Sequence, residues 1–221
     1  MTTPRTSRYV RPLTSPKTFC VDPQRGFLPL IDPLDCLPRA FTPWDNSPVP
    51  HERQIRGLYG AQVWEREGEE TEVFLTTVLG FERLGEEQGL IRYGFPESAG
   101  VLDVRETPEG RRGAWGVGCI HHLAWRVHDD RHQAEMRAHI EAAARHPTPV
   151  IDRFWFKSVY FKEPGGVLFE IATDGPGFSV DEDPAHLGES LVLPPWLEPA
   201  RPRIEQVLPT LKLHATFASR G

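Results

Sequence analysis

The chain has 221 residues, with 25 basic and 31 acidic side chains and a formal net charge of −6. This length allows one or two domains, and the acidic balance argues against nucleic acid as a partner. No apolar stretch approaches the length of a membrane span, and the three cysteines form no CxxC pair, so we expect no membrane partner and a reduced, cytoplasmic compartment.

The first 54 residues are dominated by prolines, which recur every few positions from Pro4 to Pro50. Proline cannot donate to a strand ladder, so we expect little regular structure here beyond a short strand near residues 27–31. The opening MTTPRTSRYVRPLTSPK has the composition of a transit peptide but no amphipathic apolar face. We therefore interpret it as an unstructured start.

A first regular unit is predicted from about Ile55 to Arg105. IRGLYGAQVWE (55–65) has the pattern of a strand, and GEETEVFLTTVLGF (68–81) has apolar residues at helical spacing with Gly80 as a stop signal. Three short strand candidates follow, namely FERLGE (81–86), LIRYGF (90–95) and GVLDVRE (100–106).

A second unit, predicted from about Gly118 to Thr173, repeats this order. CIHHLAWRV (119–127) is a predicted strand, and Asp129 and Asp130 precede a predicted helix over 131–146. The strand candidates that follow are TPVIDR (148–153), FKSVYFKE (156–163) and GVLFEIA (166–172). Both units thus have the order βαβββ, and their last strands share GVL, which indicates an internal repeat.

The repeat predicts an α+β fold. One βαβββ unit alone would leave an apolar sheet face open, so we expect the two units to pair into a curved, barrel-like mixed sheet with the helices outside. The predicted organisation is a Pro-rich segment and linker (1–54), a domain of two units (55–178, with units at about 55–105 and 118–173) and a tail (179–221).

A carboxylate in the middle of an apolar strand is the most unusual feature. Glu170 shares one face of its strand with Leu168 and Ala172, because side chains alternate. If His122 points into the same concavity, an imidazole and a carboxylate converge. Two histidines and one carboxylate suit non-haem Fe(II) in oxygen chemistry, and the chain supplies two of these three ligands. A simple His–Glu salt bridge is the alternative.

The repeated units, with the motifs HHLAWRV and DRFWFKSVYFKEPGGVLFEIATDGPGF, resemble the vicinal oxygen chelate superfamily. Within it, the chain is similar to the glyoxalase-like extradiol dioxygenases that cleave hydroquinone-type rings. The resemblance implies a small aromatic substrate, a hydroquinone or catechol, together with O2. It also implies Fe(II), or Mn(II), as the metal, with His122 and Glu170 as ligands.

The same resemblance gives roles to three neighbouring residues. His121 and Tyr160 are implied as groups that transfer protons, because both can donate and accept, and Arg153 as a group that stabilises the developing anion. Trp125 and the aromatic run 154–156 are candidates for lining the substrate pocket, although aromatic residues at such positions are more often core.

The chain also departs from that family, whose members have four βαβββ units and a first metal histidine on the opening strand. Residues 19–50 look like the end of a second unit, so the chain resembles only the C-terminal part and we expect it to be truncated at its N-terminus. Tyr59 stands at the position that matches His122, and His51 lies in the linker, where we expect it to be exposed. The remaining histidines are expected at the surface or in the tail: His128, His132, His139, His146, His186 and His214.

Three functional interpretations remain open at this point. The first is a ring-cleaving dioxygenase whose missing unit comes from a homo-oligomer or another polypeptide. The second is a glyoxalase-type lyase or isomerase, which would need ligands from both units. Tyr59 weighs against it, and only Asp103 could provide a second carboxylate. The third is a non-catalytic or decayed module that binds a small molecule.

Overall fold

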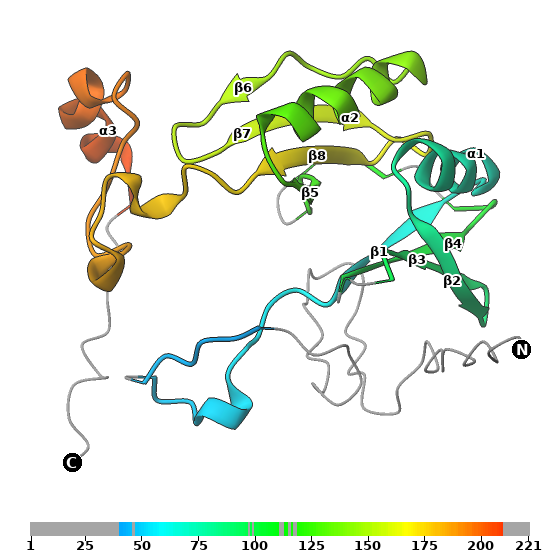
Figure 1. The fold of residues 1–221 in the computed structure, drawn as a ribbon, viewed down its shortest axis with the longest axis horizontal. Helices are drawn as coiled ribbons and strands as arrows, with labels where there is room; N and C mark the ends of the chain where they lie inside the picture. Colours follow the sequence, from blue (N-terminus) through cyan, green and yellow to red (C-terminus); the bar gives the residue numbers. More distant parts are fainter. Residues whose placement is uncertain are drawn as a thin grey trace, which may run out of the picture.

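The structure, a computed structural model, describes residues 40–209 except positions 46, 97, 99, 111, 112, 115, 117 and 118. The strand expected near 27–31 and the histidine at 214 lie outside the described residues. Two four-stranded sheets dominate the described part, and each carries one helical segment (Figure 1).

The first unit has the strand order β1-β4-β3-β2. Its elements are β1 (Gly60–Glu65), α1 (Glu69–Val73), which continues as a π-helix (Phe74–Val78), β2 (Glu82–Glu87), β3 (Leu90–Gly94) and β4 (Val101–Glu106). The second unit has the order β5-β8-β7-β6. Its elements are β5 (Leu123–Val127), α2 (Asp130–Ala142), β6 (Ile151–Asp152), β7 (Lys157–Lys162) and β8 (Leu168–Thr173).

The two sheets share one topology. In each, the first strand pairs in parallel with the last, and the remaining pairs are antiparallel. GVLDVRE and GVLFEIA therefore contribute the equivalent strands β4 and β8, and the predicted α+β fold of paired βαβββ units is confirmed. The hydrogen bonds divide the strands into two sheets, one for each unit.

Two predicted strands begin later than expected. β1 begins at Gly60 rather than at residue 55, and β5 begins at Leu123 rather than at residue 119. The partner strands explain this, since β4 begins at Val101, opposite Gly60, and β8 begins at Leu168. His121 and His122 consequently lie just before β5 rather than inside it.

Local hydrogen bonds define the two helical segments. Asp129 caps α2 as predicted, because its Oδ1 accepts from the backbone N–H of His132 at 2.8 Å. In the first unit, the predicted helix changes to π-helical geometry, and the hydroxyl of Thr77 donates to the carbonyl of Val73 at 2.6 Å. Such a hydroxyl bond competes with the regular ladder, which fits the departure from α geometry.

The two units share one hydrophobic core. Phe74 of the first unit contacts Phe161 of β7, with ring centroids 5.9 Å apart, and Phe81 meets Trp125 of β5 at 4.9 Å. Helix α2 packs on β5, β7 and β8, with Ile140 fully buried between them. The core therefore occupies one face of each sheet, and the alternating residues point to the opposite face.

The chain after β8 forms short helices that lie beside the β6–β7 turn, at the far left of Figure 1. They are Phe178–Val180, Pro184–His186, Glu198–Ala200 and α3 (Arg201–Val207), and a further short helix, His51–Arg53, precedes β1. The Trp155 indole N–H donates to Asp181 Oδ1 at 2.9 Å and fixes this segment to the turn.

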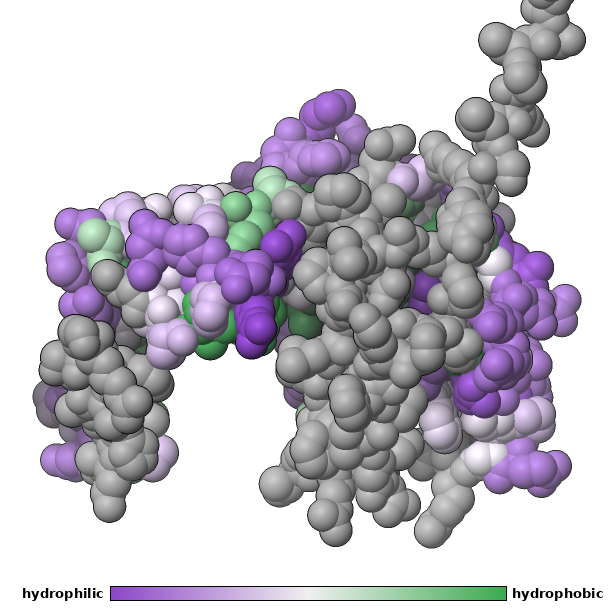
Figure 2. All heavy atoms as spheres, turned by 90° about the horizontal axis from the view of Figure 1, so that it is seen from below, coloured by the Kyte–Doolittle hydropathy of each residue, from purple (hydrophilic) through white to green (hydrophobic). Residues whose placement is uncertain are grey.

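The face drawn in Figure 2 is mainly polar where it is coloured. Seen from below, hydrophobic residues form small areas between larger hydrophilic ones (Figure 2). Among the helices of residues 40–209 that the structure describes, none has the length and apolar character needed to cross a membrane.

Candidate metal and substrate site

Glu170 lies on the face of β8 that points away from the core. Its neighbours Phe169 and Ile171 point into the core, yet Glu170 itself is only 3% exposed. One carboxylate oxygen, Oε1, accepts a hydrogen bond from the hydroxyl of Ser158, and the other, Oε2, lies 2.7 Å from Nε2 of His122. Both oxygens are therefore partnered, which offsets the cost of burying the charge.

His122 connects the carboxylate to the solvent-accessible side of the site. Its side chain is 32% exposed, and Nδ1, the nitrogen that does not face Glu170, lies 2.9 Å from Nδ1 of His121. One of these two Nδ1 atoms must carry the proton that joins them, so the tautomers of His121 and His122 are linked. The imidazole that would bind a metal is thus held from both sides.

Tyr160 and Arg153 complete the cluster. Tyr160 lies directly opposite Glu170 in the β7–β8 pair, and its ring meets the His122 ring edge-on at 5.4 Å. Arg153 Nη2 donates to the Tyr160 hydroxyl at 3.4 Å, and its guanidinium lies over the Tyr160 ring. The structure therefore brings together all five residues that the sequence indicated: His121, His122, Arg153, Tyr160 and Glu170.

The turn that carries Arg153 is strained. Phe154 follows Arg153 with a φ of 75°, in the left-handed region that side chains other than glycine rarely adopt. The turn is held by two hydrogen bonds, from the Arg153 N–H to the Phe156 carbonyl and from the Phe154 N–H to Asp152 Oδ1. Such strain often marks residues whose position serves a site.

In the first unit, the position equivalent to Glu170 forms an ion pair. Asp103 is the third residue of β4, as Glu170 is of β8, and Arg92 donates to both of its carboxylate oxygens at 2.7 and 2.8 Å. Arg92 also donates to the Tyr59 hydroxyl at 2.9 Å. Burial by itself lowers the pKa of Arg92. The hydrogen bond and the charge of Asp103 together raise it by more, so the pKa of Arg92 lies above its ordinary value. The carboxylate of Asp103 is thus already paired with a cation of the protein, Arg92.

The His122–Glu170 pair fits two adjacent positions around a metal ion. Donors at 2.0–2.2 Å from a metal and 90° apart are separated by roughly 3 Å, so a small opening from 2.7 Å suffices. Nitrogen and oxygen donors of this kind suit Fe(II) or Mn(II). In the part of the chain that the structure describes, no group of three or more His, Cys, Asp or Glu side chains could hold a metal.

Sequence reasoning missed Ser158 and left Trp125 open between the pocket and the core. The sequence offered no signal for Ser158, because a serine in a strand is unremarkable until its neighbour across the sheet is known. Trp125 was a candidate for the pocket, but it lies on the core face between Phe81 and Phe169. Of the two interpretations left open for Trp125, the structure therefore supports the core, because residues 122 and 125 point to opposite faces.

The other histidines that the structure describes lie outside the cluster. His51 is exposed and lies 3.1 Å from Asp45. His128, His139, His146 and His186 are exposed as expected, whereas His132 is half-buried against His128.

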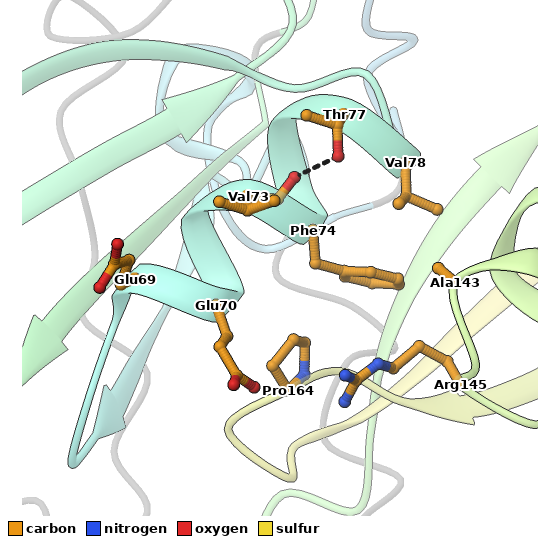
Figure 3. A pocket seen from close by; sticks show the side chains of 9 residues that line it. All are labelled: Glu69, Glu70, Val73, Phe74, Thr77, Val78, Ala143, Arg145 and Pro164. Atoms are coloured by element: carbon orange, nitrogen blue, oxygen red, sulfur yellow. Dashed lines mark hydrogen bonds between the residues drawn. The ribbon is translucent and has the colours of Figure 1, made fainter.

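A separate groove of about 580 Å³ lies on the helix-covered side, between the first helical segment and the end of α2. In Figure 3 the Phe74 ring points into it, and Glu70 and Arg145 lie on either side of Pro164. The Arg145 guanidinium stacks over the Phe74 ring at 5.9 Å. The groove marks the junction of the two units and contains none of the five cluster residues.

Known proteins similar to this chain are ring-cleaving dioxygenases by name. "Putative ring-cleaving dioxygenase MhqO" of Bacillus subtilis is 41% identical over 166 residues, which cover 75% of this chain and 53% of that protein. "Chlorohydroquinone/hydroquinone 1,2-dioxygenase" of Sphingobium indicum is 35% identical over 165 residues, covering 72% of this chain and 50% of that protein. No protein-family model matches the chain.

A solved structure agrees with the fold. The crystal structure described as a "putative dioxygenase" from Bacillus subtilis has a TM-score of 0.70 and 40% sequence identity, covering 76% of this chain and 54% of that one. The chain thus has the glyoxalase-like, vicinal oxygen chelate fold, and it is homologous to proteins named as ring-cleaving dioxygenases. It spans about half the length of these two curated relatives.

Proposed function

We propose that this chain provides His122 and Glu170 to the Fe(II) site of a dioxygenase that cleaves hydroquinone- or catechol-type rings. The observation that carries the proposal is the contact between half-buried His122 and buried Glu170, 2.7 Å apart, with Tyr160 and Arg153 at its rim. The name of the Sphingobium relative supports a hydroquinone as the substrate class. Mn(II) is the alternative metal, because the same donors suit it.

The residues around the His122–Glu170 pair have separate roles in substrate binding and proton transfer. A bound Fe(II) would supply the oxygen chemistry, which lies outside the reach of amino-acid side chains. His121 and Tyr160 are placed to hold or move the proton that a phenolic substrate loses. Arg153, which already donates to the Tyr160 hydroxyl, offers further N–H groups to an anionic oxygen.

A third protein ligand would come from outside the described residues, from a second copy of the chain or from another polypeptide. Two ligands hold a first-row metal weakly, and both bind only when deprotonated. We therefore expect the chain by itself to bind Fe(II) poorly, to cleave hydroquinones slowly, and to associate with whatever supplies the missing ligand.

Metal binding and oxygen uptake test the proposal. Fe(II) and Mn(II) are titrated anaerobically into the 221-residue chain, and oxygen uptake is then followed with hydroquinone. We expect weak binding that His122→Ala and Glu170→Gln abolish, while the exposed control His139→Ala leaves it unchanged. Binding that survives both site variants would refute the metal assignment. A full equivalent of tightly held iron would instead locate the third ligand within these residues or in a twin subunit.

A non-catalytic module that binds a small aromatic compound is the second candidate, and the incomplete ligand set of the described residues favours it. Binding of hydroquinone without metal, unchanged in Glu170→Gln, would support this candidate over the dioxygenase. A lyase of the glyoxalase type is disfavoured, since it would need the carboxylate of Asp103, and Arg92 already donates to both oxygens of that carboxylate.

A further inference from the structure

Ser158 is a buried polar residue to which the proposed chemistry gives no role. It lies on β7, is completely buried, and precedes Tyr160 by two residues, so both side chains are on the face that carries Glu170. Its hydroxyl donates to Glu170 Oε1. Glu170 Oε2 is left for His122, 2.7 Å away.

The surroundings of Glu170 make this bond decisive for the orientation of the carboxylate. Of the strand positions beside it, one holds Tyr160, whose hydroxyl accepts from Arg153. Two hold alanines, namely Ala124, paired with Glu170 itself, and Ala172, paired with Ser158. Alanine offers neither bulk nor a donor that could fix the carboxylate. Of the hydrogen bonds formed by the described residues, the one from Ser158 is the bond that reaches Oε1. Without it, the plane of the carboxylate could turn so that neither oxygen faces Nε2 of His122.

We propose that Ser158 is a positioning residue: its hydroxyl locks the Glu170 carboxylate so that Oε2 faces Nε2 of His122 and, when it is bound, the metal. The metal part of this inference rests on the proposed function. The orientation of Glu170 toward His122 does not, because it is a property of the metal-free chain. Hydrogen bonds to ligating carboxylates commonly tune metal affinity by 10–100-fold.

The first test needs no metal. A double-mutant cycle compares the unfolding equilibrium constants of Ser158→Ala, His122→Ala and the double variant, measured in urea. If Ser158 orients Glu170 toward His122, the His122→Ala substitution destabilises the Ser158→Ala variant less than it destabilises the parent. We expect this coupling to be at least about 5-fold in the unfolding equilibrium constant. Thr148→Ala is the matched control, since that hydroxyl accepts from the Tyr160 N–H and does not touch Glu170. It should combine additively with His122→Ala.

The second test uses Mn(II) alone as the probe, with free Mn(II) counted by electron paramagnetic resonance. We expect Ser158→Ala to weaken binding by about 10-fold or more, and Ser158→Thr, which keeps the hydroxyl, to stay within about 3-fold of the parent. Additive unfolding effects of Ser158→Ala and His122→Ala would overturn the positioning role, whatever the metal result. If the parent chain binds no Mn(II), the metal assignment fails, while the cycle still decides the role of Ser158.

Discussion

At the scale of single residues, the two units show what a carboxylate on this sheet face requires. Glu170 and Asp103 occupy equivalent places, the first buried and the second half-buried, and partners surround each of them. In the first unit the partner is a permanent cation, Arg92. In the second unit it is an imidazole, which can give up its proton and bind a metal. The difference between a structural ion pair and a candidate metal site therefore lies in the partners: Arg92 stands across the strand pair from Asp103, where Tyr160 stands across from Glu170.

Asp103→Asn tests the contribution of the Arg92–Asp103 ion pair to stability. Removal of one charge would leave Arg92 largely buried without its counter-ion, so we expect a loss of about 3 kcal/mol in the free energy of unfolding. Urea denaturation measures it. Glu135→Gln, which breaks an exposed ion pair with Arg131, should cost no more than about 0.5 kcal/mol. Equal effects of the two variants would contradict a special role for the Arg92 pair.

Glu65 carries the clearest pH dependence. Burial, and then the nearby negative charge of Glu163, raise the pKa of Glu65 from 4.5 to about 8. Between these values the folded chain holds a proton that the unfolded chain has lost, so this group makes stability fall as pH rises from about 4.5 to 8. Below 4.5 both states are protonated, and the contribution is fully retained.

Glu65→Gln should therefore flatten this decline. We expect the variant to gain on the parent by about 2 kcal/mol between pH 5 and pH 8, because glutamine does not titrate and the variant therefore has no proton to release on unfolding. Urea midpoints at several pH values provide the measurement. The exposed control Glu67→Gln should follow the parent curve. A Glu65→Gln curve parallel to that of the parent would show that Glu65 titrates normally.

At the scale of elements, sequence periodicity predicted the order of strands and helices but not where strands pair. The repeated GVL motif identified β4 and β8 as equivalents, because both end a unit and pair with its first strand. The starts of β1 and β5 depend on partners far away in sequence, so no local pattern could predict them. Glu170 stood out because a carboxylate is anomalous in an apolar strand. Ser158 did not, because nothing local distinguishes it.

Gln133 connects α2 to the sheet of the second unit. It is 1% exposed, and its Nε2 donates to the backbone carbonyls of Lys157 and Ile171 at 2.9 and 3.1 Å. Gln133→Leu keeps the bulk but removes both donors, so we expect a loss of about 2 kcal/mol from the carbonyls left unsatisfied. Chemical denaturation checks it, with exposed His139→Ala on the same helix as the control. If Gln133→Leu left the free energy of unfolding unchanged, water would have to replace the amide as the donor to these carbonyls.

At the scale of the whole molecule, the shared core should make the two units unfold together. Phe161 is 3% exposed and contacts Phe74 of the first unit and Phe169 of its own sheet. Phe161→Ala would leave a cavity at this junction, and we expect it to cost about 3–5 kcal/mol. Because the cavity borders both units, amide hydrogen exchange should accelerate in β3 and β4 as well as in β7 and β8. Phe178→Ala, at a side chain 62% exposed, should leave exchange in both sheets unchanged. Faster exchange confined to the second sheet would show instead that each βαβββ unit is stable on its own.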